Sequence, residues 1–240
     1  MSIEHTVKSF DEELTRLSQM VAQMGGLAEA QLQAAIEALM ARDAEQAGRV
    51  VQADAKIDQL ERQISTQTIR MLALRQPMAQ DLREIVAALK ISSDIERIGD
   101  YAANVAKRAV ALTQSPPMRP VGGVARMGRL VQQIIKDTLD AFSAKDADKA
   151  VAAWKRDQEV DDMYNSIFRE MLTYMMEDPR NIGPSTHLMF IAKNIERIGD
   201  HATNIAEIVH FLVRGEEIAE VRPKSDRTSF AVVSPPEEKA

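Results

Sequence analysis

Acidic side chains and asparagines recur at one fixed spacing in both halves of this 240-residue sequence. The hexapeptide Ile-Glu-Arg-Ile-Gly-Asp stands at 95–100 and again at 195–200, and an asparagine follows four residues after each aspartate. A pair of aspartates, also four residues apart, precedes each hexapeptide. The full set is Asp54, Asp58, Glu96, Asp100 and Asn104 in the first half, and Asp157, Asp161, Glu196, Asp200 and Asn204 in the second. Every member offers a side-chain oxygen as a donor atom.

Oxygen donors without histidine or cysteine favour a hard cation, such as Mg²⁺, Mn²⁺, Ca²⁺ or iron. Residues four apart lie above one another on a helix, so each series forms a row of oxygens on one helix face. A helical wheel places Glu96, Asp100 and Asn104 nearly opposite the apolar stripe, pointing away from the core, and places Asp54 and Asp58 at the edge of such a stripe. Two rows on neighbouring antiparallel helices would give four carboxylates and one amide in each half. We predict metal binding at both sets, with Mg²⁺, Mn²⁺ or iron as the cofactor.

A charged helix face that merely contacts water is the simplest alternative, because most charged faces do so. Such a face tolerates many polar residues, yet both halves keep Glu, Asp and Asn in the same order. Like charges four residues apart also cost roughly a few tenths of a kcal/mol. Gly99 and Gly199 stand inside the predicted helices, where glycine costs about 1 kcal/mol relative to alanine. Close approach of a neighbouring helix explains these glycines equally well with or without a metal.

The elements that must position these residues are predicted to be six helices. Apolar periodicity sets their extents, with Asp43 and Asp146 as N-caps and Pro77 as a break. The fold class is therefore all-α, with two tandem, pseudo-symmetric three-helix bundles. The expected helices cover residues 10–40, 44–73, 78–112, 124–143, 146–177 and 184–213.

The domain organisation follows from the same repeat. We expect a first three-helix repeat over 1–113, a linker over 114–123, and a second repeat over 124–214. The remaining stretch, 215–240, has several prolines and no periodic apolar residues, so we expect a disordered tail that buries little.

Composition excludes several classes of protein. The net charge of −6 disfavours a general nucleic-acid binder, and the absence of cysteine excludes disulfides and thiolate metal sites. No apolar run approaches the ~20 residues of a membrane-spanning helix, and the N-terminus lacks the apolar core of a signal peptide. The sequence also has no phosphate-binding loop and no recognisable nucleophile triad. These features predict a cytoplasmic protein that is not an enzyme.

Together these motifs resemble the PhoU family of bacterial phosphate-uptake regulators. The resemblance covers about residues 5–213 and rests on the duplicated three-helix unit, both hexapeptides, the upstream aspartate pairs and the run at 81–100. The acidic motifs credited with metal binding in that family map onto Glu96/Asp100 and Glu196/Asp200, and onto the pairs Asp54/Asp58 and Asp157/Asp161.

The resemblance implies a non-enzymatic regulator of phosphate homeostasis. A member of this family restrains uptake by the phosphate-specific ABC transporter and holds phosphate-starvation signalling by the sensor kinase in its off state. The implied partners are the transporter's ATPase subunit, the phosphate-sensing histidine kinase and a second copy of the chain in a homodimer. Contact with the membrane would run only through these partners.

Two other functions stay open at the level of sequence. A redox enzyme with a carboxylate-bridged di-metal site would place its ligands inside the bundle and add Glu-x-x-His motifs. Neither Glu96 nor Glu196 is followed by histidine at that spacing. A plain helical scaffold without metal would use the acidic rows only for solvation.

Overall fold

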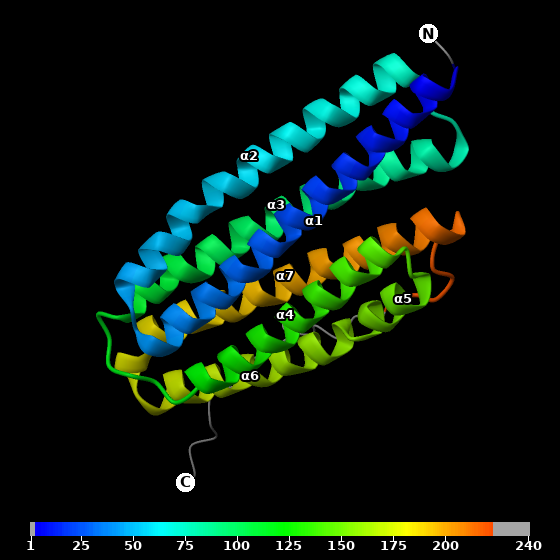
Figure 1. The fold of residues 1–240 in the computed structure, drawn as a ribbon. Coiled ribbons are helices and arrows are strands. Elements are labelled where there is room, and N and C mark those ends of the chain that lie inside the picture. The colour runs from blue at the N-terminus through cyan, green and yellow to red at the C-terminus, as the bar shows by residue number, and fades with distance from the viewer. Residues whose placement is uncertain (1–2, 223–240) are drawn as a thin grey trace.

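The computed structural model describes residues 3–222, and all of the regular structure in that range is helical (Figure 1). None of these helices is both long and apolar enough to cross a lipid bilayer. The helices are α1 (Ile3–Ala41), α2 (Ala44–Arg75), α3 (Ala79–Leu112), α4 (Val121–Ala144), α5 (Ala147–Lys155), α6 (Asp157–Glu177), the short 3₁₀ helix η1 (Pro179–Asn181) and α7 (Ile182–Arg214).

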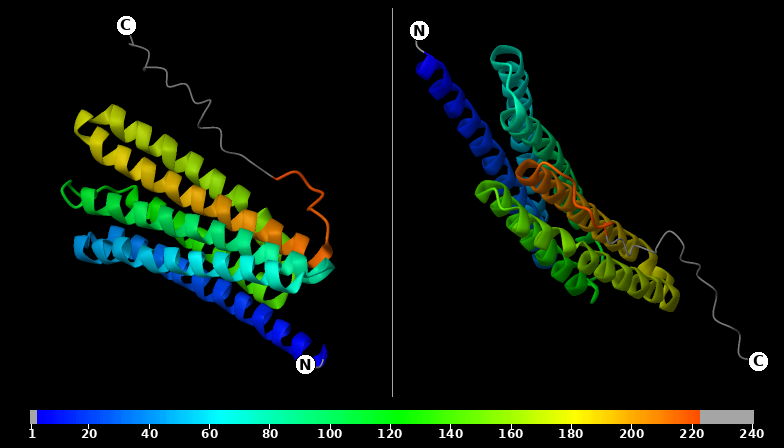
Figure 2. Two further views of the ribbon diagram at one scale, coloured as in Figure 1. Left: turned by 90° about the horizontal axis from the view of Figure 1, so that it is seen from above. Right: turned by 90° about the vertical axis from the view of Figure 1, so that its right-hand side faces the viewer.

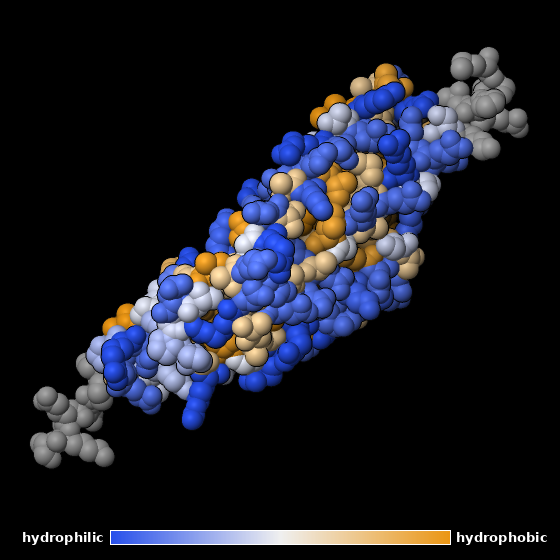
Figure 3. All heavy atoms as spheres, turned by 60° about the vertical axis from the view of Figure 1, so that its left-hand side comes forward, coloured by the Kyte–Doolittle hydropathy of each residue, from blue (hydrophilic) through white to orange (hydrophobic). Residues whose placement is uncertain are grey.

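The predicted fold class is confirmed. Helices α1, α2 and α3 form one three-helix unit, and α4, the α5–α6 segment and α7 form the other (Figure 1). The two units lie side by side, with α3 packed along α7 and α1 packed along α4 (Figure 2). Hydrophilic side chains cover most of the face drawn in Figure 3, around a smaller area of hydrophobic ones.

The second helix of the second unit is broken where the sequence predicts a continuous helix over 146–177. At Arg156 the backbone makes hydrogen bonds between residues three apart, Arg156 N to Ala153 O and Glu159 N to Arg156 O, both at 3.1 Å. This tight turn divides α5 from α6. No proline or glycine stands there, so the sequence carries no signal for the break.

Both predicted N-caps are present and begin corresponding helices of the two units. The Asp43 side chain accepts a hydrogen bond from Gln46 N, and the Asp146 side chain accepts from Asp148 N and Lys149 N. These bonds satisfy amide groups that have no partner within the helix. The same capping chemistry therefore fixes where the second helix starts in each copy.

The contact between the units has polar parts on both sides. Between α1 and α4, Gln132 Nε2 donates to Gln33 Oε1 at 3.1 Å. Tyr101 of α3 stacks on His201 of α7 with ring centroids 5.7 Å apart and planes inclined by 29°. His201 Nδ1 also lies 2.7 Å from Asp94 Oδ1. Corresponding positions of the two hexapeptide helices thus touch directly.

Gly25 and Gly26 of α1 offer a stability test of this packing. A methyl group at Gly26 meets nothing within 4 Å, whereas at Gly25 it would lie 2.6 Å from a methyl carbon of Leu139 on α4. We expect Gly26→Ala to raise the free energy of unfolding by about 1 kcal/mol through helix propensity. Gly25→Ala is expected to lower it, because Leu139 must be displaced. Chemical denaturation of both variants checks the pair, and equal effects would contradict the α1–α4 contact.

Residues 215–222 differ from the expected disordered tail, while residues 223–240 lie outside the described range. Gly215 ends α7 in the left-handed conformation at φ 78° and turns the chain back along the bundle (Figure 2). Ile218 then packs against the hydrophobic core, and Glu220 Oε1 lies 3.2 Å from Lys155 Nζ. Specific side chains hold this segment although it lacks apolar periodicity.

Candidate cation-binding site

The predicted site residues lie on two pairs of neighbouring helices. In the first unit, α2 carries Asp54 and Asp58 and α3 carries the row from Glu96 to Asn104; we name these five residues the first patch. In the second unit, α6 carries Asp157 and Asp161 and α7 carries the row from Glu196 to Asn204; we name these five the second patch. Each patch thus spans the contact between two helices.

The acidic rows are more buried than the helical wheel predicted. Glu96 and Asp100 are partly buried, and Asp157, Asp161 and Glu196 are buried, with Glu196 only 6% exposed. The expectation that the rows point away from the core therefore fails at Glu196, whereas the other members of the two rows are partly exposed. A wheel describes one helix by itself, whereas here the second helix of each unit packs beside the row.

The first patch brings like charges together. Burial raises the pKa of Asp54, and the neighbouring carboxylates of Asp100 and Asp58 raise it further, against a hydrogen bond from Gln31. Burial likewise raises the pKa of Glu96, assisted by Asp100. The folded protein therefore disfavours the charged forms of both carboxyl groups.

Hydrogen bonds hold Asp54 and Asp100 in place without neutralising the first patch. Gln31 Nε2 donates to Asp54 Oδ1 at 3.1 Å and to the Val50 carbonyl at 3.3 Å. Arg97 lies 3.3 Å from Asp100 and 3.5 Å from Glu96, and its side chain is largely exposed. Exposed pairs of this kind stabilise weakly, so the clustered charge of the patch persists.

Gly99 allows α2 to approach α3 closely at the first patch. A methyl group at Gly99 would lie 3.0 Å from Asp54 Oδ1 and 3.0 Å from the Ile57 Cδ1. The equivalent methyl at Gly199 would lie 3.3 Å from Val160. The close approach expected for these glycines is present. It is tighter at Gly99, where the neighbouring atom is a carboxylate oxygen of Asp54.

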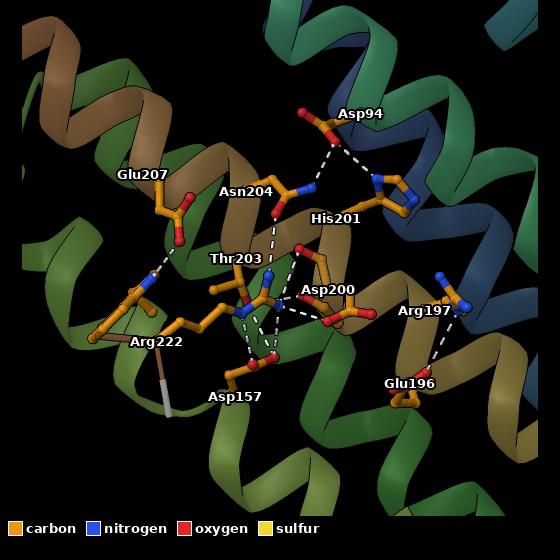
Figure 4. Close-up of polar contacts among 12 residues, drawn as sticks. Asp94, Asp157, Glu196, Arg197, Asp200, His201, Thr203, Asn204, Glu207 and Arg222 are labelled. Atoms are coloured by element: carbon orange, nitrogen blue, oxygen red, sulfur yellow. Dashed lines mark hydrogen bonds and ion pairs between the residues drawn. The ribbon is translucent and has the colours of Figure 1, made fainter. Parts of the chain in front are cut away.

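The second patch contains a residue that sequence reasoning missed, Arg222 from the tail (Figure 4). Its Nε donates to Asp157 Oδ2 at 2.9 Å, its Nη2 donates to Asp200 Oδ1 at 2.7 Å, and its Nη1 donates to Asn204 Oδ1 at 3.2 Å. Thr203 Oγ1 also donates to Asp157 Oδ1 at 3.1 Å. One guanidinium therefore joins the acidic groups of α6 to those of α7.

Arg222 is charged in this setting. Burial by itself would lower the pKa of Arg222, but the hydrogen bond and charge of Asp157, with the charges of Asp200 and Glu207, raise it above its ordinary value. Asp157 is only 2% exposed, so this ion pair is largely withdrawn from water. A buried carboxylate of this kind needs a cationic partner.

The two remaining acids of the second patch are also engaged. Glu196 Oε1 accepts a hydrogen bond from Lys193 Nζ at 2.9 Å, and Asp161 is 4% exposed beside Val160. Asn204 Nδ2 donates to Asp94 Oδ1 of the first unit at 3.3 Å. The second patch is thus part of a network that reaches α3.

The chemistry of these donors fits a hard cation, although the side chains do not enclose one. Within residues 3–222, no group of three or more histidine, cysteine, aspartate or glutamate side chains is arranged so that it could hold a metal ion. The first patch nevertheless concentrates carboxylates whose pKa values are raised, and the second patch already surrounds a positive charge. The residues that would hold a metal are the carboxylates and asparagine of each patch.

Comparison with known proteins finds the same domain twice in this chain. A family profile described as the PhoU domain matches residues 21–109 and again residues 124–209. The chain belongs to the PhoU family. Each match contains one complete patch, whereas Arg222 lies beyond the second match.

Relatives in the PhoU family align over nearly the whole chain. The phosphate-specific transport system accessory protein PhoU homolog of Caulobacter vibrioides is 54% identical over 93% of this chain and 97% of the relative. The homolog of the same name from Xylella fastidiosa strain Temecula1 is 52% identical over 94% of this chain and 93% of the relative. The shared architecture is therefore that of the whole chain.

Solved structures of PhoU proteins have the same fold. The crystal structure of PhoU from Pseudomonas aeruginosa is 43% identical, with a TM-score of 0.84, and the match covers 86% of this chain and all of that one. The phosphate transport system regulatory protein PhoU from Streptococcus pneumoniae is 30% identical, with a TM-score of 0.81, over 88% of this chain and all of that one.

Proposed function

We propose that this protein is an accessory regulator of phosphate transport and is not an enzyme. The observation that carries the proposal is the pair of PhoU domains, supported by relatives over half identical whose names assign them to the phosphate-specific transport system. The site contributes acidic side chains between helices and, in both rows, lacks the Glu-x-x-His pattern of di-metal oxidases. The redox alternative therefore lacks its characteristic motif at both rows.

The proposal also states the sign of the regulation and the partner proteins. The protein acts as a negative regulator of uptake by the phosphate-specific ABC transporter and of starvation signalling through the phosphate-sensing histidine kinase. Its partners are the transporter's ATPase subunit, the kinase and a second copy of itself, and it works in the cytoplasm. The acidic net charge of −6 supports protein partners in preference to nucleic acid.

The proposal also includes metal binding at both patches, with Mg²⁺, Mn²⁺ or iron as the ion. At the first patch, Asp54, Glu96 and Asp100 would hold the ion, which would neutralise carboxylates that now repel one another. At the second patch, Asp157, Asp200 and Asn204 would hold it. A metal bound between two helices would stiffen the unit that carries it.

Gene expression tests the regulatory role. In a deletion strain grown in rich phosphate, genes of the phosphate-starvation response are expected to stay on, because the signal-off state is lost. Restoring the gene should switch them off again. Starvation genes that remain repressed without the protein would contradict negative regulation. A strain restored with Glu96→Ala/Asp100→Ala separates the metal from the regulatory role, since full repression there would make the first patch unnecessary.

A further inference from the structure

A cavity of about 430 Å³ lies where the two units meet. Its walls come from α3 of the first unit, from α5 and α7 of the second, and from the segment that follows Gly215. None of the ten residues of the acidic patches lines it. Cavities of this size hold small organic ligands in proteins. The cavity is therefore a candidate ligand site that is distinct from the two patches.

One stripe of α3 supplies a cationic wall of the cavity. Arg83, Val86, Ala87 and Lys90 stand at positions i, i+3, i+4 and i+7, which share one face of a helix. Neither Arg83 nor Lys90 forms a hydrogen bond or an ion pair with another residue in the described range. The third cation at the cavity, Arg222, is already bonded to the second patch. Two unpaired cations thus lie about two helical turns apart on this wall.

Arg83 contributes a buried donor without an acceptor. Its Nε is buried and makes no hydrogen bond within residues 3–222. A donor that is withdrawn from water without a partner destabilises the fold, and more strongly when the group is charged. The end of α7 confines this side chain, since a methyl group at Gly215 would lie 3.8 Å from Arg83 Cζ. An anionic group in the cavity would supply the acceptor that Arg83 lacks.

The acidic side chains at the cavity leave this positive charge in place. Glu207 Oε1 accepts a hydrogen bond from Trp154 Nε1 at 2.8 Å, and Glu220 Oε1 lies 3.2 Å from Lys155 Nζ. The remaining acid, Glu217, is exposed, so water and salt screen its charge. The cavity therefore favours an anion along its α3 wall.

Apolar side chains form much of the rest of the lining. Trp154 of α5 is buried, and Ile208 and Phe211 of α7 stand across from α3, with Ile218 from the segment after Gly215. Apolar surface that these side chains remove from water stabilises a bound molecule in proportion to its area. The lining as a whole therefore matches a molecule with an anionic head and an apolar body.

We propose that this cavity binds an organic phosphate monoester with an apolar body. A phosphate monoester carries two negative charges on one head, which suits the two unpaired cations Arg83 and Lys90. The arginine guanidinium can also give such a head two parallel hydrogen bonds. The body of the ligand lies against Trp154 and Phe211. Because the walls come from both units, the bound ligand joins them. This site depends neither on the proposed metal ions nor on the proposed partner proteins.

Octyl phosphate, used below the concentration at which it forms micelles, is the probe. Trp154 is the reporter, because it lines the cavity and is the sole tryptophan of the sequence. We expect octyl phosphate to change the emission of Trp154 with one-site saturation. Arg83→Gln should weaken this binding at least about tenfold, because a charge-assisted hydrogen bond is lost. Val86→Glu should do the same by placing a carboxylate between the cations, and it keeps the test valid if Arg83→Gln does not fold.

The controls separate the head of the ligand from its body. Arg129→Gln removes the same charge from an exposed position of α4 outside the cavity, and it should leave the affinity for octyl phosphate unchanged. Octanoate has a similar apolar body but a single charge, and inorganic phosphate has no apolar body. Each should bind at least about tenfold more weakly than octyl phosphate, since it forms only part of the contacts.

Several results would overturn this ligand site. If octyl phosphate leaves Trp154 emission unchanged and gives no heat in isothermal titration calorimetry, the cavity does not bind it. If Arg83→Gln and Val86→Glu both bind octyl phosphate with the affinity of the parent, the ligand lies elsewhere. Equal affinity for octanoate overturns the assignment of a phosphate head, and equal affinity for inorganic phosphate overturns the role of the apolar walls. None of these results bears on the gene-expression test of the regulatory role.

Discussion

Truncation after Gly215 is expected to lower the melting temperature in chelator by about 5–10 °C. The truncation removes Arg222 and leaves Asp157, which is 2% exposed, without its cationic partner. Stranding one member of a largely buried, hydrogen-bonded ion pair costs about 2–3 kcal/mol. For a chain of this size, each kcal/mol corresponds to about 2–4 °C. Thermal unfolding followed by circular dichroism measures the change.

A truncation after Lys224 is the matched control, because it retains Arg222 and the contacts described for residues 215–222. We expect its melting temperature to lie within about one degree of the parent. Arg222→Ala should reproduce most of the loss caused by the shorter chain. If the chain ending at Gly215 has the same melting temperature as the parent, Arg222 does not stabilise the second patch.

Equivalent double variants of the two patches are expected to change stability in opposite directions when metal is chelated. Glu96→Ala/Asp100→Ala should match or slightly exceed the parent, since both carboxylates hydrogen bond or pair only with Arg97 among the described residues. Because the pKa of Glu96 is raised in the folded state, folding favours its protonated form, and its charge lowers stability at neutral pH. Glu196→Ala/Asp200→Ala should melt below the parent, because it breaks the contact of Asp200 with Arg222.

Added metal should then separate the variants further. A metal ion at a hundredfold excess over its Kd stabilises the folded state by about 2.7 kcal/mol. The parent should gain this amount at the first patch, and Glu96→Ala/Asp100→Ala should lose it, because two of the carboxylates proposed to hold that ion are removed. Differential scanning calorimetry with Mg²⁺, Mn²⁺ and iron measures both. If none of the three metals raises the melting temperature of the parent, the metal proposal is contradicted.

The fold could be predicted from the sequence because local signals agree with the packing. Asp43 and Asp146 mark helix starts that the structure confirms. The apolar stripes of α3 and α7 contain Ile91, Ile98 and their repeats, all of which are buried. The break at Arg156 had no such signal, since a single 3₁₀-type turn needs neither proline nor glycine.

The site could be predicted only in part, because its environment comes from other elements. Spacing alone placed Asp54 with Asp100 and Asp157 with Asp200, and the helices do bring these pairs to one surface. The burial of Glu196 depends on neighbouring helices, which a helical wheel does not include. Arg222 stands in an aperiodic, proline-containing tail with other basic residues nearby, so nothing in its sequence context distinguishes it.

The stacked rings of Tyr101 and His201 also carry information about the origin of this architecture. The two residues occupy the same position in the two copies, and α3 packs on α7 as α1 packs on α4. Contact between identical positions is the mark of an isologous interface, in which a two-fold axis relates two equal partners. The chain is thus organised as a covalently fused dimer of three-helix units. The surface through which an ancestral single unit would have paired is now internal, so self-association of the full chain must use a different surface.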